Sequence, residues 1–219
     1  MKKILVVTSS RADYYLLRPL ILKLKTLKEF QLEIIATGSH HLKNHGYTVK
    51  EIEQDFLEYH SIKILNSQTN SSAIQKNLPH YLKKFLAFFN KSNPDLVILL
   101  GDRYEVFLAA IASLFNAIPI AHIHGGEVTH GAIDDPMRHS ITKMSNFHFV
   151  SNSSYKKRVT QLGENPKNIF NVGPMVLDNL IDNKFLSKEE LCKLISINKL
   201  DPFFLITIHP ETYGEHNNL

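Results

Sequence analysis

Residues 94–102 read Pro-Asp-Leu-Val-Ile-Leu-Leu-Gly-Asp, and they contain the most apolar strand that the chain predicts. An uninterrupted aliphatic run over 96–100 is typical of a parallel strand that helices cover on both faces. After Gly101 and Asp102, the apolar spacing over 104–115 is helical. A strand, a short turn and a helix in this order indicate an α/β protein.

The same alternation of strand and helix runs outward from this unit in both directions. Short apolar runs predict further strands at 4–8, 32–37, 62–64, 119–123 and 147–150. Apolar residues at helical spacing predict helices at 14–27, 73–89, 104–115, about 136–144 and 151–163, with an interruption near Pro79. Repeated alternation with short connections predicts an α/β fold with a doubly wound, mostly parallel Rossmann-like sheet.

A domain boundary is predicted after residue 175. Residues 1–175 are expected to form an N-terminal Rossmann-like domain. The remainder, 176–219, predicts a connecting helix at 177–185, a helix opened by a capping box at Ser187, and a strand at 203–208. One strand and one helix cannot close a core, so we expect 176–219 to be the incomplete start of a second Rossmann-like domain.

Composition indicates an ordinary globular protein of the cytoplasm. Lysine and arginine number 25 against 21 acidic residues, and the basic residues are scattered, so we predict no nucleic-acid partner. Cys192 is the single cysteine, which excludes an intrachain disulfide and favours a reducing compartment. No stretch approaches the roughly 20 apolar residues of a membrane span. The apolar run that begins at Ile4 is too short for a signal peptide.

Charged and imidazole side chains follow the predicted strands at their carboxyl ends, which is where ligands bind in an open α/β sheet. Asp102 and Arg103 follow the strand at 96–100, and His124 and Glu127 follow the strand at 119–123. Two more residues of this kind, Arg11 and Asp13, follow the strand at 4–8. Three others lie beyond the loop at 122–127: Asp134, Arg138 and His139. Together they suit acid–base chemistry on an anionic substrate.

Structural alternatives exist for several of these residues. Asp102 could instead cap the helix that begins near residue 104. Arg11 could be a surface charge rather than a phosphate ligand at a helix N-terminus. The loop at 122–127 is more specific, because Gly125 and Gly126 permit close approach of a ligand and are flanked by histidines and a carboxylate.

Neither a metal nor a cofactor is predicted. His122 and His124, two residues apart on a strand, make a metal site conceivable, but the sequence has no His-Glu-x-x-His and no cysteine cluster. No Gly-x-Gly-x-x-Gly follows the strand at 4–8, so the fingerprint of a nicotinamide cofactor is absent.

At these residues the chain resembles the hydrolysing UDP-N-acetylglucosamine 2-epimerases, in the branch that serves bacterial sialic and related nonulosonic acid synthesis. The matching stretches occur in order across essentially the whole chain: Ser9 to Tyr14, Gly101 to Glu105, His122 to Glu127, Asp134 to Met144, and His209 to Thr212. The resemblance implies two Rossmann-like domains facing a cleft, as in GT-B glycosyltransferases. This chain would be the N-terminal half of a C-terminally truncated member. The full-length enzyme is expected to be a homo-oligomer that binds a UDP-sugar.

The resemblance also implies a reaction in two steps. UDP leaves by anti elimination across C1–C2, and water then adds with inversion at C2 to release N-acetylmannosamine. By motif, the catalytic candidates are Asp102, Glu127, Asp134, His124 and His209, and the substrate-binding candidates are Arg11, Asp13, Arg103, Arg138 and His139. Other branches carry Glu at the site of His124, so the acid–base role stays open between His124 and Glu127.

Three alternatives to this function remain open at this point. The same chemistry could act on UDP-N,N'-diacetylbacillosamine or on a GDP-sugar, because base selectivity resides in the second domain. The chain could instead be an inactive remnant, or it could catalyse a metal-dependent hydrolysis. Since the family's second domain holds most contacts to the uridine and the diphosphate, we expect the chain alone to be inactive or very weakly active.

Overall fold

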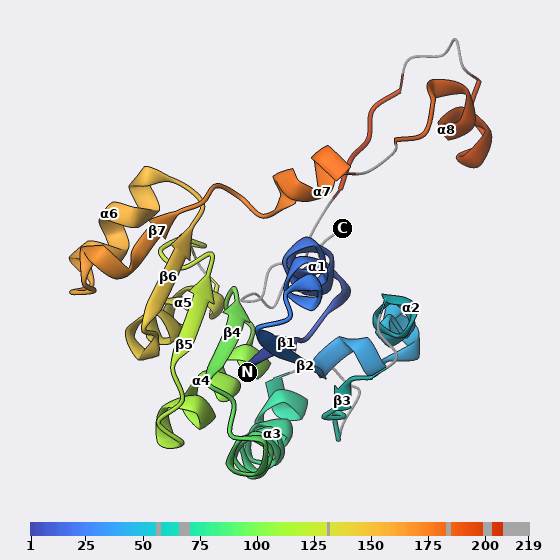
Figure 1. Ribbon diagram of the computed structural model, residues 1–219. Helices are drawn as coiled ribbons and strands as arrows, with labels where there is room; N and C mark the ends of the chain where they lie inside the picture. The colour runs from blue at the N-terminus through green and yellow to red at the C-terminus, as the bar shows by residue number, and fades with distance from the viewer. Residues whose placement is uncertain (56–57, 66–70, 131, 183–184, 199–202, 208–219) are drawn as a thin grey trace.

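A single parallel sheet organises the protein. The computed structural model describes residues 1–55, 58–65, 71–130, 132–182, 185–198 and 203–207. Within these residues, seven strands pair in the order β3-β2-β1-β4-β5-β6-β7 (Figure 1). Their bounds are β1 (Lys2–Thr8), β2 (Phe30–Ala36), β3 (His60–Ser61), β4 (Leu96–Leu100), β5 (Ile120–Ile123), β6 (Phe147–Val150) and β7 (Ile169–Asn171). The chain winds from β1 to one edge and then from β4 to the other, which confirms the doubly wound fold.

Helices connect the strands and cover both faces of the sheet. Their bounds are α1 (Arg11–Thr26), α2 (Val49–Asp55), α3 (Ser71–Ser92), α4 (Tyr104–Phe115), α5 (Asp134–Met144), α6 (Ser153–Gln161), α7 (Val176–Asp182) and α8 (Lys188–Leu194). Helices α1 and α2 pack on one face, whereas α3, α4 and α5 pack on the other. Short 3₁₀ helices at 38–41, 43–45 and 166–168 complete the connections.

Burial on both faces explains the aliphatic run at 96–100. Val97 and Leu99 belong to the core beneath α3 and α4, whereas Ile98 and Leu100 belong to the core beneath α1. Successive side chains of a strand point to opposite faces, so a strand covered on both sides needs an apolar residue at every position. A polar substitution at any of these positions would therefore place an unpaired group in one core or the other.

Two predicted elements needed correction. The third strand is β3 at His60–Ser61, whereas 62–64 was expected. Ser61 pairs with Ala36, the last residue of β2, so the residues after Ser61 have no strand residue to pair with in β2. Helix α3 runs unbroken through Pro79, where an interruption was expected. Pro79 lies on the exposed side of α3, where water can satisfy the carbonyl that its missing N–H leaves free.

Helix α2 and strand β7 are not predicted by the sequence pattern. Helix α2 buries Val49 and Ile52, which is too few apolar residues for a clear helical period. Strand β7 has three residues, of which only Ile169 is buried. Both elements lie toward the edges of the sheet, where one covered face is enough and the sequence signal is correspondingly weak.

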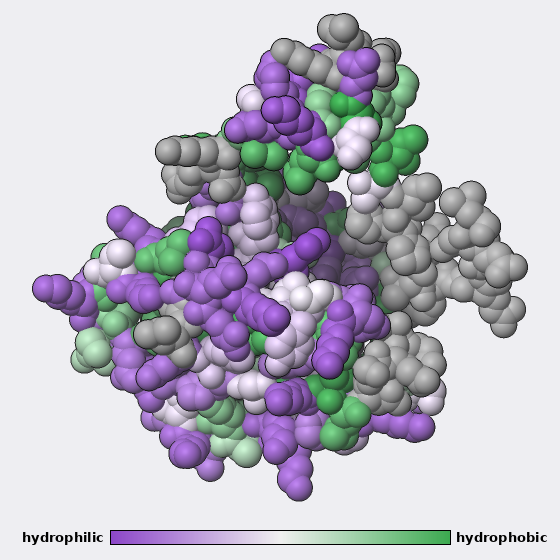
Figure 2. All heavy atoms as spheres, turned by 90° about the vertical axis from the view of Figure 1, so that its right-hand side faces the viewer, coloured by the Kyte–Doolittle hydropathy of each residue, from purple (hydrophilic) through white to green (hydrophobic). Residues whose placement is uncertain are grey.

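Residues beyond 175 present apolar side chains to solvent. The capping box at Ser187 is confirmed, and it opens α8. The strand expected at 203–208 is not formed by 203–207, where Phe204 and Leu205 are exposed by 94% and 89%. Apolar side chains also gather over the part of the molecule that holds α8 (Figure 2). None of the helices described is both long and apolar enough to span a bilayer.

Phenylalanines at two positions allow a matched test of the core. Phe85 on α3 is fully buried, whereas Phe115 at the end of α4 is 78% exposed. Phe85→Ala should lower the free energy of unfolding by about 3–5 kcal/mol, because it removes buried surface and leaves a cavity. Phe115→Ala should change it by less than about 0.5 kcal/mol. Urea unfolding of both variants checks this, and equal losses would contradict the assignment of the core.

Candidate functional site

The predicted site residues gather where the sheet changes direction. The strand order reverses between β1 and β4, and the crevice outside such a switch point is where open α/β sheets bind ligands. The loops that follow β1, β4, β5 and β6, together with the first turn of α5, are called the rim below. They comprise residues 9–13, 101–105, 124–127, 151 and 134–139.

His122 holds two parts of the rim together from beneath. Its imidazole is fully buried on β5, with Nε2 donating to the carbonyl of Gly101 at 2.8 Å and Nδ1 lying 3.2 Å from Oγ1 of Thr142 on α5. The contact with a carbonyl requires a proton on Nε2, and burial disfavours a second proton, so the ring is neutral and Nδ1 carries none. Burial lowers the pKa of His122 to about 3. His122 therefore has a structural role that the sequence did not indicate.

Asp102 is paired with a buried arginine and does not cap a helix. The N-cap of α4 is Arg103, and its side chain makes no capping hydrogen bond. Instead, Oδ2 of Asp102 accepts from Nη2 of Arg138, whose guanidinium also donates to Oγ1 of Thr129 at 3.0 Å. The side chain of Asp102 is 19% exposed and that of Arg138 only 7%. The arginine is thus fixed by the protein, and the carboxylate lies at the edge of the crevice.

The first turn of α5 adds more charge beside this pair. Oδ1 of Asp135 accepts from the backbone N–H of Thr129 at 2.8 Å and lies 3.6 Å from Nη1 of Arg138. Nε2 of His139 lies 3.5 Å from Oδ2 of Asp135. Asp134 is half-buried at the start of α5. Together these side chains form an acidic cluster around one arginine.

The environment of Asp102 favours proton transfer. Burial raises the pKa of its carboxyl above the ordinary value, and the negative charges of Asp134 and Asp13 act in the same direction. Arg138 opposes this shift by favouring the ionised form. A carboxyl whose pKa is raised toward neutrality accepts a proton more readily, which is the property expected of a general base.

A second group of side chains surrounds Glu127. Oε1 of Glu127 accepts from Oγ of Ser151 at 2.9 Å and lies 3.4 Å from Nδ1 of His124. Burial lowers the pKa of His124, Glu127 raises it, and the charge of Arg138 lowers it further. This group follows β5 and Asp102 follows β4, and these two strands are paired neighbours in the sheet. Ser151 was missed from the sequence, although it follows β6 directly and the rule of strand ends would have found it.

The loop after β1 separates the two residues predicted there. Arg11 is exposed at the first position of α1 and makes no hydrogen bond or ion pair with any described residue. Asp13 is buried and turned inward, where Oδ2 accepts from the backbone N–H of Ser9 at 3.1 Å and from its hydroxyl at 2.5 Å. Oδ1 accepts from the hydroxyl of Ser10 at 2.8 Å. Asp13 therefore shapes the loop, and Arg11 is free to reach a ligand.

Arg103 is held by a buried carboxylate that the sequence analysis did not single out. Nη2 of Arg103 lies 3.2 Å from Oε1 of Glu105, which is 1% exposed, while the Arg103 side chain is 39% exposed. Gly38 makes room for this carboxylate, because a Cβ there would lie 2.6 Å from Oε1 of Glu105 and 2.5 Å from the carbonyl of Ser9. Its φ of +56° also favours glycine. Arg103 thus has one guanidinium nitrogen held by Glu105, while its side chain as a whole is partly exposed.

Two further expectations concern metals and His209. Within the residues that the structure describes, no group of three histidine, cysteine or acidic side chains is arranged to hold a metal ion. His209, which the resemblance gives as a catalytic candidate and as a candidate for contact with the phosphate, lies outside the described residues. The functional roles of the rim residues remain predictions.

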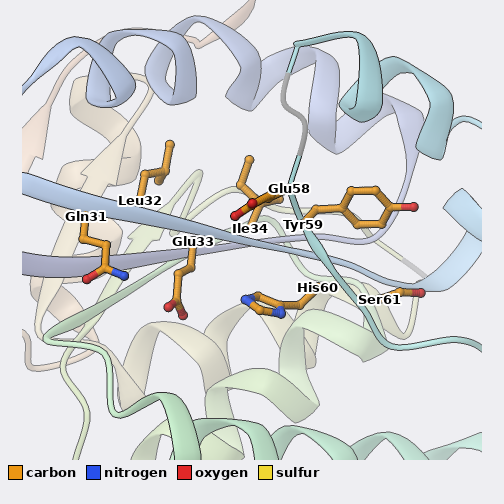
Figure 3. A pocket seen from close by; sticks show the side chains of 8 residues that line it. All are labelled: Gln31, Leu32, Glu33, Ile34, Glu58, Tyr59, His60 and Ser61. Atoms are coloured by element: carbon orange, nitrogen blue, oxygen red, sulfur yellow. The ribbon is translucent and has the colours of Figure 1, made fainter.

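A groove lies elsewhere on the sheet, between β2 and the segment that leads into β3 (Figure 3). It has a volume of about 640 Å³ and is lined by residues 31–34 and 58–61. Its carboxylate Glu33 is already engaged, since it accepts from Ser92 at 2.5 Å and lies 3.4 Å from the ammonium of Lys3. None of the predicted site residues lines this groove. The rim, and not the groove, is therefore the candidate site.

Comparison with known proteins points to one family. A family profile described as UDP-N-acetylglucosamine 2-epimerase matches residues 22–219. The GDP/UDP-N,N'-diacetylbacillosamine 2-epimerase (hydrolyzing) of Campylobacter jejuni is 41% identical over 99% of this chain and 56% of its own length. The polysialic acid biosynthesis protein P7 of Escherichia coli is 42% identical over 97% of this chain and 54% of its own length. The chain thus spans about half the length of these curated relatives.

A solved structure shares the fold. The UDP-GlcNAc 2-epimerase of Methanocaldococcus jannaschii, solved in complex with UDP-GlcNAc and UDP, superposes with a TM-score of 0.73 at 21% identity. The match covers 89% of this chain and 54% of that one. The seven-stranded sheet therefore corresponds to one half of the GT-B-like arrangement of these epimerases, as the resemblance implied.

Acid should weaken the fold through His122. Because its folded pKa of about 3 lies below the ordinary value of 6.5, the unfolded chain binds the proton more tightly. Above about pH 6.5, His122 therefore does not make the free energy of unfolding depend on pH. Below about pH 6.5, His122 lowers the free energy of unfolding by about 1.4 kcal/mol for each unit by which the pH falls. In His122→Gln this slope should be flatter by that amount. Urea unfolding between pH 7.5 and 5 measures it.

Exposed His45 provides the control for this experiment. His45→Gln should leave the slope of the wild type unchanged. If His122→Gln and the wild type lose stability in parallel as the pH falls, His122 is not a buried neutral imidazole.

Proposed function

The chain belongs to the UDP-N-acetylglucosamine 2-epimerase family, and we propose that it supplies the sugar-facing half of a hydrolysing nucleotide-sugar 2-epimerase. The observation that carries this proposal is the placement of two engaged carboxylates after the neighbouring strands β4 and β5, with Asp102 held by Arg138 and Glu127 held by Ser151. Two separately held carboxylates suit a reaction that needs one group to remove a proton and another to supply one.

The proposed reaction has two stages. A base at the rim takes the proton from C2 as the bond between C1 and the diphosphate oxygen breaks, which leaves a glycal and a nucleoside diphosphate. Water then supplies a hydroxyl to C1, and an acid at the rim delivers a proton to C2 from the opposite face. Asp102, with its raised pKa, is the proposed base for the first proton. Glu127 and Asp134 are the proposed acid–base groups of the second stage.

Cationic side chains of the rim are proposed to bind the departing diphosphate. Arg11 is exposed at the N-terminus of α1, where backbone N–H groups and the helix dipole also favour an anion. Arg103 presents a partly exposed guanidinium from the neighbouring loop. Arg138 and His139 are proposed to orient the sugar through their contacts with Asp102 and Asp135. His209 stays a predicted phosphate ligand. Stabilising the leaving group is as necessary as removing the proton, because the C1–O bond breaks in the same step.

The sugar is proposed to be N,N'-diacetylbacillosamine in preference to N-acetylglucosamine. The relative from Campylobacter jejuni, 41% identical, is named for this substrate on GDP or UDP. The name of the Escherichia coli relative gives a pathway, polysialic acid biosynthesis, and no substrate. UDP-N-acetylglucosamine, the substrate in the description of the family, is the second candidate.

The division of the protein into two units is part of the same proposal. Residues 1–175 would form the half that carries the rim, and 176–219 would begin the half that holds the nucleotide. Apolar side chains of α7, α8 and 203–206 are exposed, which supports packing of this stretch against further protein. The complete enzyme is proposed to be a homo-oligomer.

Turnover in D2O tests the proposed function. The chain is completed to the length of its relatives with the second half of the Campylobacter jejuni relative. Because that half would supply the nucleotide contacts, the informative comparison is between two sugars on the same nucleotide, UDP. We expect release of UDP, deuterium at C2 of the product, and a higher kcat/KM for the diacetylbacillosamine sugar. No release of UDP from either substrate, or product without deuterium at C2, would overturn the proposal.

Asp102→Asn tests the proposed base in the same completed protein. The amide keeps the shape of the side chain but cannot take a proton, so kcat should fall by roughly 10²–10⁴-fold while KM changes little. Steady-state kinetics with UDP release as the readout measure both constants. A normal kcat would return Asp102 to a structural role beside Arg138.

A further inference from the structure

Two side chains meet at one oxygen of Glu127. Oγ of Ser151, at the end of β6, donates to Oε1 at 2.9 Å, and Nδ1 of His124 lies 3.4 Å from the same oxygen. Among the described residues, none forms a hydrogen bond with the other oxygen, Oε2. The Glu127 side chain is 27% exposed, so its carboxylate is reachable from solvent. One oxygen is therefore held and the other is free.

The backbone fixes His124 in the place where it can make this contact. Its φ is +64°, a left-handed conformation that a residue with a Cβ adopts only when its surroundings require it. Its backbone N–H donates to the carbonyl of Phe149 on β6 at 2.9 Å, which ties the turn to the sheet. A strained residue held by its neighbours is a common feature of functional sites.

The contacts of His124 also decide which of its nitrogens carries a proton. The backbone N–H of Met175 points at Nε2 from 3.4 Å, so Nε2 is the acceptor and its lone pair is occupied. The proton of the neutral ring then resides on Nδ1, which faces Oε1 of Glu127. His124 is thus oriented toward Glu127 and not toward an incoming sugar.

We propose that Ser151 and His124 are positioning residues that hold Oε1 of Glu127, so that Oε2 is the atom that exchanges a proton with the sugar. This inference rests on the proposed function, and it assigns to Glu127 the acid–base role that the sequence left open between Glu127 and His124. The proton moves between Oε2 and C2 of the sugar, while the hydroxyl of Ser151 and Nδ1 of His124 keep their own protons. The hydrogen bond from Ser151 and the nearby ring of His124 limit rotation of the carboxylate.

Kinetics of the completed protein test the role of Ser151. Ser151→Ala should lower kcat about ten-fold with KM changed less than about two-fold, because it removes a hydrogen bond to a charged group and no contact with substrate. Ser151→Thr keeps the hydroxyl and should restore kcat to within about three-fold of the wild type. Ser154, exposed nearby on α6, gives the matched control, and Ser154→Ala should leave kcat unchanged.

A double-mutant cycle separates positioning from a merely structural effect. If Ser151 acts through Glu127, Ser151→Ala should cause no further loss of kcat in a Glu127→Gln background. Additive losses would overturn the proposal, as would a Ser151→Ala variant with normal kcat.

A measurement that needs no turnover checks the arrangement in which Ser151 and His124 hold Oε1 of Glu127, called the clamp below. In the ¹⁵N NMR spectrum of the 219-residue chain labelled at histidine, the neutral ring of His124 should carry its proton on Nδ1. A proton on Nε2 would overturn the proposal whatever the kinetics. If the completed protein turns over no nucleotide sugar, the proposed function and the proton exchange at Oε2 both fail, and the NMR result still decides whether the clamp exists.

Discussion

The buried imidazole of His122 is the contact on which the arrangement of the candidate site depends. From β5 it reaches the carbonyl of Gly101 after β4 and the hydroxyl of Thr142 on α5. Those two elements carry Asp102 and Arg138, the pair at the centre of the rim. Because a buried carbonyl without a donor costs about 1–3 kcal/mol, loss of the ring would weaken the link between these two elements. Gly125 lies against the ring, where a Cβ would come within 3.0 Å of Nδ1 and of Thr142.

The fold could be predicted from the sequence wherever burial is complete. The run at 96–100 and the helix at 104–115 have the predicted bounds, because a strand covered on both faces and a helix packed in the core leave unambiguous patterns. The position of the rim could likewise be predicted, because ligands bind at the carboxyl ends of the strands in an open α/β sheet. The sequence pattern does not predict the direction in which each rim side chain points. Asp13 faces inward to hold Ser9, and Glu105 is buried behind Arg103. Those orientations depend on neighbours from other strands, and local sequence does not encode them.

The proposed reaction would divide its proton transfers between two separately anchored carboxylates of the rim. Asp102 is engaged by Arg138 and raised in pKa chiefly by burial, whereas Glu127 is held by Ser151 and His124 near the end of β6. The two carboxylates thus have different partners, which suits a reaction with a separate base and acid. Arg11 begins α1 after β1, and Arg103 lies in the loop after β4. In the proposed reaction, these two positive charges would bind the departing diphosphate.

The central claim is that the sugar binds at the rim, between the loops after β4 and β5. A crystal structure of the completed protein with a bound nucleotide sugar tests it most directly. The account predicts that C2 of the hexose lies within about 3–3.5 Å of a carboxylate oxygen of Asp102 or Glu127. A sugar bound in the groove between β2 and β3, or at the rim with both carboxylates turned away from C2, would contradict it.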